Sequence, residues 1–367
     1  HGHPRVVGAI NVTIDTLPFS PRRYTNAPAV ELARRLCTAA PGDDNKLLFA
    51  PGGTAAIGMA LKLARLVTGR YKTLSMWDSF HGASLDAISV GGEAVFRRGI
   101  GPLLPGSEHV PPCDPKSCVF GCGGQCVLRC VDYIDYCLAK EGDVAAVIVE
   151  TIRCTDVQVP PVDYYRRLRA ACDRHGALLI VDEIPIALGR TGHLFAIERY
   201  GIEPDMLVVG KGLGGGIMPL AALIARGRFD VGQHISLGHY THEKNPVACA
   251  AALATLDVLA EEDLVARSRQ LGAAALTWLQ GLAARCHAVD SVRGAGLLLG
   301  IELRAVGQRP AADLAEAVLY RCLSAGLSFK VGQGNVLVLA PPLNIVEADF
   351  WRALGLVEAA LVAECGP

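Results

Sequence analysis

One apolar run in this 367-residue chain ends in a lysine set among glycines: Met206-Leu207-Val208-Val209-Gly210-Lys211-Gly212-Leu213-Gly214-Gly215-Gly216. A second run, Leu178-Leu179-Ile180-Val181, ends in the carboxylates Asp182 and Glu183. Short continuous apolar runs are typical of strands that are buried on both faces, as in a parallel sheet covered by helices. Open α/β sheets bind ligands beyond the carboxyl ends of such strands. The two runs therefore predict an α/β protein with a ligand site at that edge.

Apolar runs alternate with helical patterns over the first two thirds of the chain. Strands are predicted at 73–77, 144–149, 177–181, 205–209 and 220–224, and helices at 27–38, 55–68 and 162–174. This alternation predicts a mostly parallel sheet with crossover helices. After Pro246, an Ala/Leu-rich stretch predicts a long helix over 247–288, followed by β-like runs at 296–303 and 335–339. We predict an N-terminal remnant (1–26), a large domain (27–246) and a smaller α+β domain (247–367).

The composition points to a globular protein with a small-molecule partner. Hydrophobic residues make up 51% of the chain and charged residues 19%, which excludes disorder and coiled coil. The 35 Lys and Arg nearly balance the 36 Asp and Glu, so no overall field attracts nucleic acid or an anionic membrane. Neither a membrane-spanning run nor a signal peptide is evident, although the start at His1 indicates that natural residues precede it. The thirteen cysteines, an odd number, predict a reducing, cytoplasmic location.

Lys211 and Asp182 are the candidate reactive groups. Burial among apolar residues would lower the pKa of Lys211 and make its free amine a nucleophile toward carbonyls. A surface lysine beside a glycine turn is the alternative. Asp182 can hold a protonated ring nitrogen, as a pyridinium cofactor requires, or it can cap a helix.

Two further segments suggest a phosphate and a ring. Gly52-Gly53-Thr54 precedes the predicted helix at 55–68, and free backbone N–H groups at a helix start bind phosphate. Phe80, in Phe80-His81-Gly82, offers an aromatic face for stacking. A helix cap and a core phenylalanine are the alternatives. An amine, a carboxylate, a phosphate site and a stacking ring together predict pyridoxal 5′-phosphate as the cofactor.

The segment from Leu178 to Gly216 resembles the signature of the class III (ornithine/4-aminobutyrate type) aminotransferases of PLP fold type I. The residues that carry the resemblance are Asp182-Glu183-Ile184, Gly189-Arg190-Thr191-Gly192, Pro204-Asp205 and Lys211 to Gly216. Other motifs follow in the family's order: His1-Gly2-His3-Pro4, Gly53-Thr54, Asn245-Pro246 and Pro341-Pro342-Leu343. The resemblance covers the whole chain, and it implies a homodimer with shared active sites.

The resemblance implies a role for each matching residue. Lys211 would bind the cofactor covalently and move the substrate proton, while Asp182 would bind the pyridine nitrogen. The remaining cofactor contacts would come from Gly53 and Thr54 at the phosphate, Phe80 and Ile184 on the two ring faces, His81 and Glu150 near the ring, and Thr241 at the partner subunit's phosphate.

The chain departs from the family pattern at the substrate. Val338 stands where members specific for amino acids usually have an arginine, and valine cannot clamp a carboxylate. Pro185 replaces the usual glutamine, and Glu243 and Lys244 replace residues that are often glycine. Arg153 is an added cation. We predict an anionic substrate bound by Arg153 or Lys244, with Arg22 and Arg23 as alternatives.

With these departures, the chain resembles two branches of the family. One comprises 3-aminobenzoate synthases of aminocyclitol antibiotic pathways, and the other is an ammonia-lyase for 1-hydroxy-2-aminoethylphosphonate. We favour the first, in which an amino donor such as L-glutamate serves to aminate 3-dehydroshikimate, with dehydration and aromatisation to 3-aminobenzoate. The lyase and an ordinary ornithine/4-aminobutyrate-type aminotransferase remain alternatives.

A cysteine-rich segment stands apart from these motifs. Its cysteines are separated by four, three, three and three residues: Cys113, Cys118, Cys122, Cys126 and Cys130. Zinc sites usually contain Cys-x2-Cys pairs, which this spacing lacks. We predict no metal here, and a reduced loop near a dimer interface.

Overall fold

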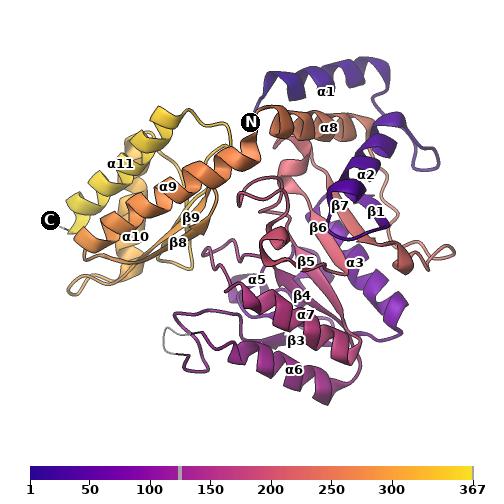
Figure 1. Cartoon of the computed structure of the whole chain (residues 1–367), viewed down its shortest axis with the longest axis horizontal. Helices are drawn as coiled ribbons and strands as arrows, with labels where there is room; N and C mark the ends of the chain where they lie inside the picture. The colour runs from indigo at the N-terminus through magenta and orange to yellow at the C-terminus, as the bar shows by residue number, and fades with distance from the viewer. Residues whose placement is uncertain (123–125, 366–367) are drawn as a thin grey trace. The chain divides into compact units, whose positions relative to one another are not determined.

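The chain folds around two β-sheets, each with its own hydrophobic core (Figure 1). The computed structural model describes residues 1–122 and 126–365. Residues 1–151, 160–187 and 197–258 form the first unit, and residues 152–159, 188–196 and 259–367 form the second. Within the described chain, no helix combines the length and hydropathy needed to cross a bilayer.

A seven-stranded sheet forms the centre of the first unit. Its order is β1-β7-β6-β5-β4-β2-β3, with strands β1 (Asn45–Ala50), β2 (Lys72–Met76), β3 (Ser107–Val110), β4 (Val144–Glu150), β5 (Leu178–Asp182), β6 (Met206–Val209) and β7 (Ala221–Arg226). The strands from β3 through β6 are parallel, and β7 runs antiparallel to both of its neighbours. The predicted mostly parallel sheet is confirmed. Strand β3 was not predicted, because its four residues Ser-Glu-His-Val lack an apolar run.

Helices surround this sheet. They are α1 (Pro4–Thr16), α2 (Ala27–Ala39), α3 (Gly53–Thr68), α4 (Leu85–Val90), α5 (Ala94–Arg97), α6 (Arg129–Glu141), α7 (Asp163–His175) and α8 (Pro246–Glu261), with short 3-10 turns η1 (Ala196–Tyr200), η2 (Lys211–Gly214) and η3 (Gly227–Phe229). Ile57 and Ala60 of α3 share a core cluster with Ile180 and Val208 of the sheet. Small side chains on α3 allow the helix to lie close to the strands. That packing fixes the helix start, Gly53, near the strand ends.

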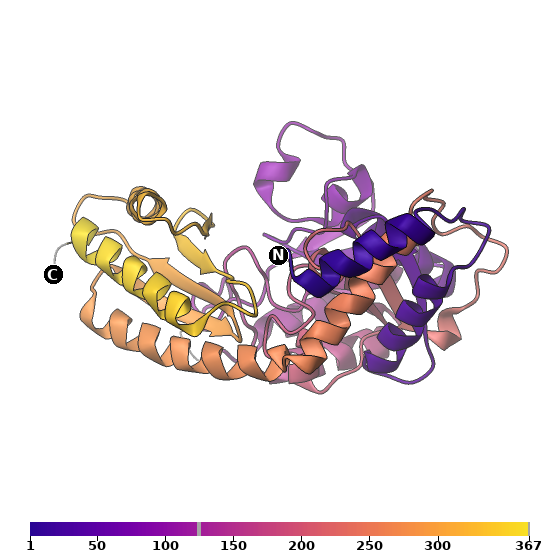
Figure 2. The same ribbon diagram turned by 90° about the horizontal axis from the view of Figure 1, so that it is seen from above.

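The N-terminal segment is a packed part of the first unit. Val6 and Ile10 of α1 cluster with Val247, Ala251 and Ala254 of α8, and Figure 2 shows the two helices side by side. This packing keeps α8 with the first unit as far as Val258, so the units divide twelve residues beyond the predicted boundary at 246. A single helix over 247–288 is not formed, because Asp263 adopts a left-handed φ of 46° between α8 and the next helix.

The second unit is a smaller α+β structure, as predicted. Its antiparallel sheet has the order β10-β11-β9-β8, with strands β8 (Val289–Ala295), β9 (Leu298–Leu303), β10 (Lys330–Gly332) and β11 (Val336–Leu339). Its helices are α9 (Leu264–Arg285), α10 (Ala311–Ser324) and α11 (Glu347–Cys365). Leu279, Ile301, Val318 and Val357 are fully buried in its core.

Candidate active site

Neighbouring strands bring two carboxylates to one edge of the large sheet. Glu150, the last residue of β4, pairs in register with Asp182, the last residue of β5. Both residues are buried. The next strand, β6, ends at Val209, two residues before Lys211. The sheet therefore assembles Glu150, Asp182 and the start of the lysine turn at its carboxyl edge, where α/β folds bind ligands.

Two contacts fix the Asp182 carboxylate. Its Oδ2 lies 2.8 Å from Nδ1 of His81, and its Oδ1 accepts the backbone N–H of Ile184 at 3.0 Å. The His81 ring is buried as well. Sequence reasoning included His81 among the cofactor contacts but did not foresee its pairing with Asp182. No sequence signal reports that contact, because 101 residues separate the two side chains.

Glu183 proves to be a structural residue. Its Oε1 accepts hydrogen bonds from the Thr151 hydroxyl at 2.8 Å and from the backbone N–H of Ile197 at 2.7 Å. The side chain is fully buried. Of the two adjacent carboxylates, Glu183 holds two loops together while Asp182 stands at the site.

The start of α3 has the uncapped backbone that an anion site requires. Gly52 precedes it in an extended conformation and has no side chain to cap the helix N–H groups. Ala83 donates its backbone N–H to the hydroxyl of Thr54 at 3.3 Å. A Cβ atom added to Gly82 would lie 2.5 Å from the same hydroxyl oxygen. The loop after β2 thus lies directly against the helix start.

Ile184 connects this helix start to the lysine turn. A Cβ atom on Gly53 would lie 2.7 Å from Ile184 Cδ1, and one on Gly210 would lie 3.3 Å from Ile184 Cγ2. Glycine at both positions lets the two backbone segments pack against the Ile184 side chain. The structure therefore brings Gly53, Thr54, His81, Asp182 and Ile184 into a single region.

Lys211 differs from its prediction in one respect. It begins η2 with a left-handed φ of 42°, and its side chain is exposed in the single chain. The amine is not buried in the single chain as predicted, because Lys211 begins the turn after β6 and does not lie in the strand itself. Exposure leaves the amine accessible to a ligand seated beside Asp182.

Phe80 and Thr241 lie in loops of the first unit. The ring of Phe80 is half-buried and packs on Phe96, with their centroids 4.6 Å apart and a tilt of 45°. Thr241 is exposed in the loop before α8. The ring-stacking and partner-phosphate roles of these two residues stay predictions.

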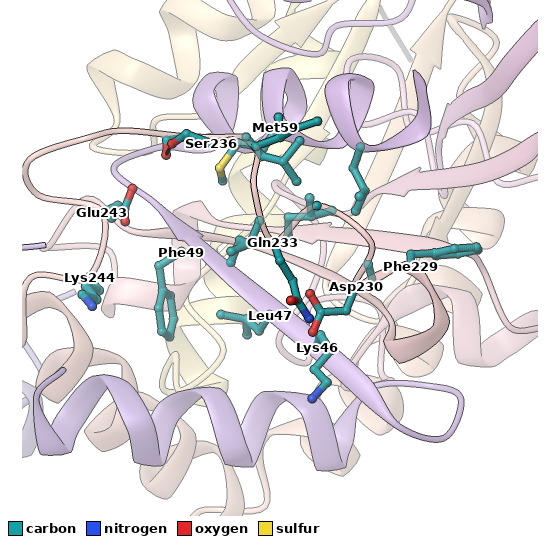
Figure 3. A pocket seen from close by; sticks show the side chains of 18 of the residues that line it. Lys46, Leu47, Phe49, Met59, Phe229, Asp230, Gln233, Ser236, Glu243 and Lys244 are labelled. Carbon is teal, nitrogen blue, oxygen red and sulfur yellow. Dashed lines mark hydrogen bonds between the residues drawn. The ribbon is translucent and has the colours of Figure 1, made fainter. Parts of the chain in front are cut away.

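Lys244 lines a separate cavity of about 430 Å³ in the first unit. Figure 3 shows Lys244 and Glu243 beside this cavity, together with Lys46 and Phe49 of β1. Asp182 and Lys211 are not among its lining residues. The structure thus does not join Lys244 to the Asp182 site through this cavity.

Arg153 forms a buried ion pair within the second unit. Its Nε and Nη2 bind the two carboxylate oxygens of Asp156 at 2.8 and 2.5 Å. A short bridge between Arg153 and Gln158 closes the turn that carries this pair. Asp156 therefore neutralises the positive charge of Arg153, which was predicted to bind the substrate anion.

Replacing Arg153 by alanine is expected to destabilise the protein rather than weaken substrate binding. Removing one member of a buried ion pair costs about 3–5 kcal/mol, since the other charge stays buried. Urea unfolding measures the loss, and Arg304→Ala, which removes the exposed partner of Asp290, is the control. A large rise in the substrate KM without a loss of stability would instead identify Arg153 as a substrate ligand.

Val338 is a core residue of the second unit. It lies in β11, paired with Gly300 of β9 and with Lys330 of β10, and is buried. Nearby, Arg190 donates to the carbonyls of Leu297 and Pro341 at 3.0 and 2.5 Å, and burial lowers its pKa to about 10. Arg190 binds backbone carbonyls, so it does not replace the carboxylate-binding arginine that position 338 lacks.

A Gly82→Ala change is expected to raise the dissociation constant of pyridoxal phosphate about tenfold, because the methyl group displaces the Thr54 hydroxyl. Fluorescence titration of the apoprotein measures this constant. Gly69→Ala is the matched control: Gly69 also has a positive φ, but nothing lies within 4 Å of its added Cβ. Equal affinities in the two variants would contradict a role for this loop in phosphate binding.

Comparison with known proteins gives a consistent result. A family model described as aminotransferase class-III matches residues 1–361. The (R)-1-hydroxy-2-aminoethylphosphonate ammonia-lyase of Vibrio splendidus is 46% identical over 382 residues, covering 100% of this chain and 80% of that protein. The acetylornithine aminotransferase of Methanopyrus kandleri is 37% identical over 368 residues, covering 99% of this chain and 86% of that protein.

The fold also matches solved structures. An amine transaminase from an uncultivated Pseudomonas species, solved in a PLP-bound form, has a TM-score of 0.92 and 31% identity. The match covers 100% of this chain and 88% of that one. The predicted fold class, a large PLP-binding sheet domain with a smaller α+β domain, is confirmed.

Proposed function

This chain belongs to the class-III aminotransferase family, and from that membership we propose that it releases ammonia from a 1-hydroxy-2-aminoalkylphosphonate. The family makes it a pyridoxal 5′-phosphate enzyme that acts on small amino compounds. One observation carries the finer proposal: the Vibrio splendidus ammonia-lyase is 46% identical over the whole chain. The proposal revises our preference for 3-aminobenzoate synthesis, which becomes the second candidate.

The residues present fit the cofactor. The phosphate would lie at the start of α3, where Gly52 leaves the helix N–H groups without a side-chain cap and the loop at Gly82 packs against Thr54. Asp182, positioned by His81, would hold the ring nitrogen, and Ile184 would cover one ring face. When bound, pyridoxal phosphate supplies an electron sink for a carbanion beside the substrate nitrogen.

The chain's own groups would then carry the proton steps. Lys211 would take the proton from the carbon that bears nitrogen, and its accessible amine suits that transfer. Asp182 would keep the ring nitrogen charged, which favours the carbanion. The hydroxyl of the adjacent carbon would leave as water, giving an enamine that becomes an imine and hydrolyses. Since one water leaves and another enters, the net products are ammonia and a phosphonate-bearing aldehyde.

The residue at position 338 gives no support to a carboxylate substrate. A two-point arginine clamp suits a carboxylate, and position 338 offers buried valine instead. The phosphonate would need cations from elsewhere. Of Arg153 and Lys244, only Lys244 is kept as a candidate, because Arg153 is already paired with Asp156. Lys244 would have to reach the phosphonate from the separate cavity that it lines.

The assembly and location are proposed with the function. A homodimer would let Thr241 reach the partner's phosphate, and its exposure in the single chain leaves it available for that contact. Sedimentation of the PLP-loaded enzyme measures whether it is a dimer. The cytoplasmic location stays a prediction.

The decisive experiment compares two sets of substrates on one PLP-loaded preparation. Racemic 1-hydroxy-2-aminoethylphosphonate is added alone, and ammonia is measured by a coupled assay while phosphorus NMR follows the aldehyde. In parallel, L-glutamate and 3-dehydroshikimate are added together, and mass spectrometry looks for 3-aminobenzoate. Ammonia equal to the aldehyde formed, with no 3-aminobenzoate, is the expected result. Formation of 3-aminobenzoate without ammonia release from the phosphonate would reverse the assignment.

A further inference from the structure

The cysteine-rich segment has no part in the proposed reaction, yet its thiols lie close together. Cys118 and Cys122 are both free thiols, and the Cys118 Sγ donates to the Cys122 Sγ at 3.3 Å. A disulfide has an S–S distance of about 2.05 Å. The two sulfurs thus need to approach by only a little more than about 1 Å to bond.

Cys122 also has contacts that favour its thiolate form. The backbone N–H of Val127, the Cys118 thiol and the backbone N–H of Arg129 lower the pKa of Cys122, and its side chain is only partly covered. These contacts stabilise the thiolate, which is the nucleophilic form of cysteine. Burial instead raises the pKa of Cys137, on helix α6. Cys122 therefore combines accessibility, thiolate character and an adjacent second thiol.

We propose that Cys118 and Cys122 form a reactive dithiol that low-molecular-weight disulfides oxidise to an internal disulfide. The Cys122 thiolate attacks one sulfur of the reagent, forming a mixed disulfide and releasing one reagent thiolate. Cys118 then loses its proton and attacks the Cys122 sulfur, which closes the protein disulfide and releases the second reagent thiolate. The protein loses two electrons, the reagent gains them, and each released thiolate takes up a proton.

The chain offers a direct test by peptide mass spectrometry. Holoenzyme is treated with oxidised glutathione at neutral pH, alkylated under denaturing conditions and digested with trypsin. Cleavage after Lys116 and Arg129 yields one peptide, 117–129, that contains Cys118, Cys122 and Cys126. We expect this peptide to lose two hydrogen atoms and to carry one alkyl group, on Cys126. We expect it to react at least about tenfold faster than Cys137 in the same sample.

Variants identify the pair. In Cys118→Ser, Cys122 is expected to remain as a stable mixed disulfide with glutathione, because the resolving thiol is gone. In Cys126→Ser and Cys137→Ser the disulfide is expected to form as in the unchanged enzyme. Persistence of the internal disulfide in Cys118→Ser would overturn the pairing.

Two other results would overturn the proposal as a whole. One is oxidation of peptide 117–129 no faster than that of Cys137. The other is one equivalent of tightly bound zinc per chain with thiols that react only after a chelator is added, since these sulfurs would then be metal ligands. Neither result bears on ammonia release, so this proposal and the proposed function can fail independently.

Discussion

Replacing Lys211 by alanine is expected to lower kcat by on the order of 10⁴-fold, because in the proposed reaction this one residue would both bind the cofactor covalently and move the substrate proton. Alanine cannot do either. Ammonia release at saturating phosphonate measures the rate. Gel filtration of the loaded protein, followed by its visible spectrum, is expected to show that the variant loses its cofactor.

A second lysine variant controls for the loss of a positive charge. Lys62 is exposed on helix α3, whose start is the proposed phosphate site. Lys62→Ala is expected to keep the unchanged rate and spectrum. If Lys211→Ala kept its activity within tenfold of the unchanged enzyme, Lys211 would not be the catalytic amine. Lys211 has a left-handed φ, a conformation in which alanine is strained as well. Thermal unfolding of Lys211→Ala therefore checks that a loss of activity is not a loss of folding.

The large sheet could be predicted because its apolar runs are continuous. Strands β4, β5, β6 and β7 lie within two residues of their predicted bounds, since burial on both faces leaves an unmistakable pattern. Strand β3 and the break at Asp263 have no such pattern. One depends on pairing with β2, and the other depends on the backbone conformation of one residue.

The candidate site was predictable in its residue types and not in its contacts. Gly53, Asp182 and Lys211 could be found because each follows a strand or opens a helix. Their neighbours could not, because contacts such as His81 with Asp182 join loops far apart in the sequence. The ion pair of Arg153 is different. Asp156 stands three residues away, so a local check of charge pairing would have found it.

The carboxylates Asp182 and Glu183 allow the cofactor contact to be separated from fold stability. Asp182→Asn is expected to lower kcat by about 10²- to 10⁴-fold, because the amide cannot balance a protonated ring nitrogen. The asparagine oxygen still accepts the N–H of Ile184, and its amide N–H can donate to Nδ1 of a neutral His81, so the melting temperature is expected to change little. Ammonia release measures the first effect, and calorimetry measures the second.

Glu183→Gln is the matched control at the next position, and the expected outcome is the reverse. Glu183 accepts bonds from Thr151 and Ile197, and both become weaker when the acceptor loses its charge. Hydrogen bonds to charged groups contribute about 1.5–3 kcal/mol, so stability falls while kcat stays near that of the unchanged enzyme. If Glu183→Gln lowered kcat as much as Asp182→Asn while both variants stayed folded, the assignment of the ring nitrogen to Asp182 alone would be wrong.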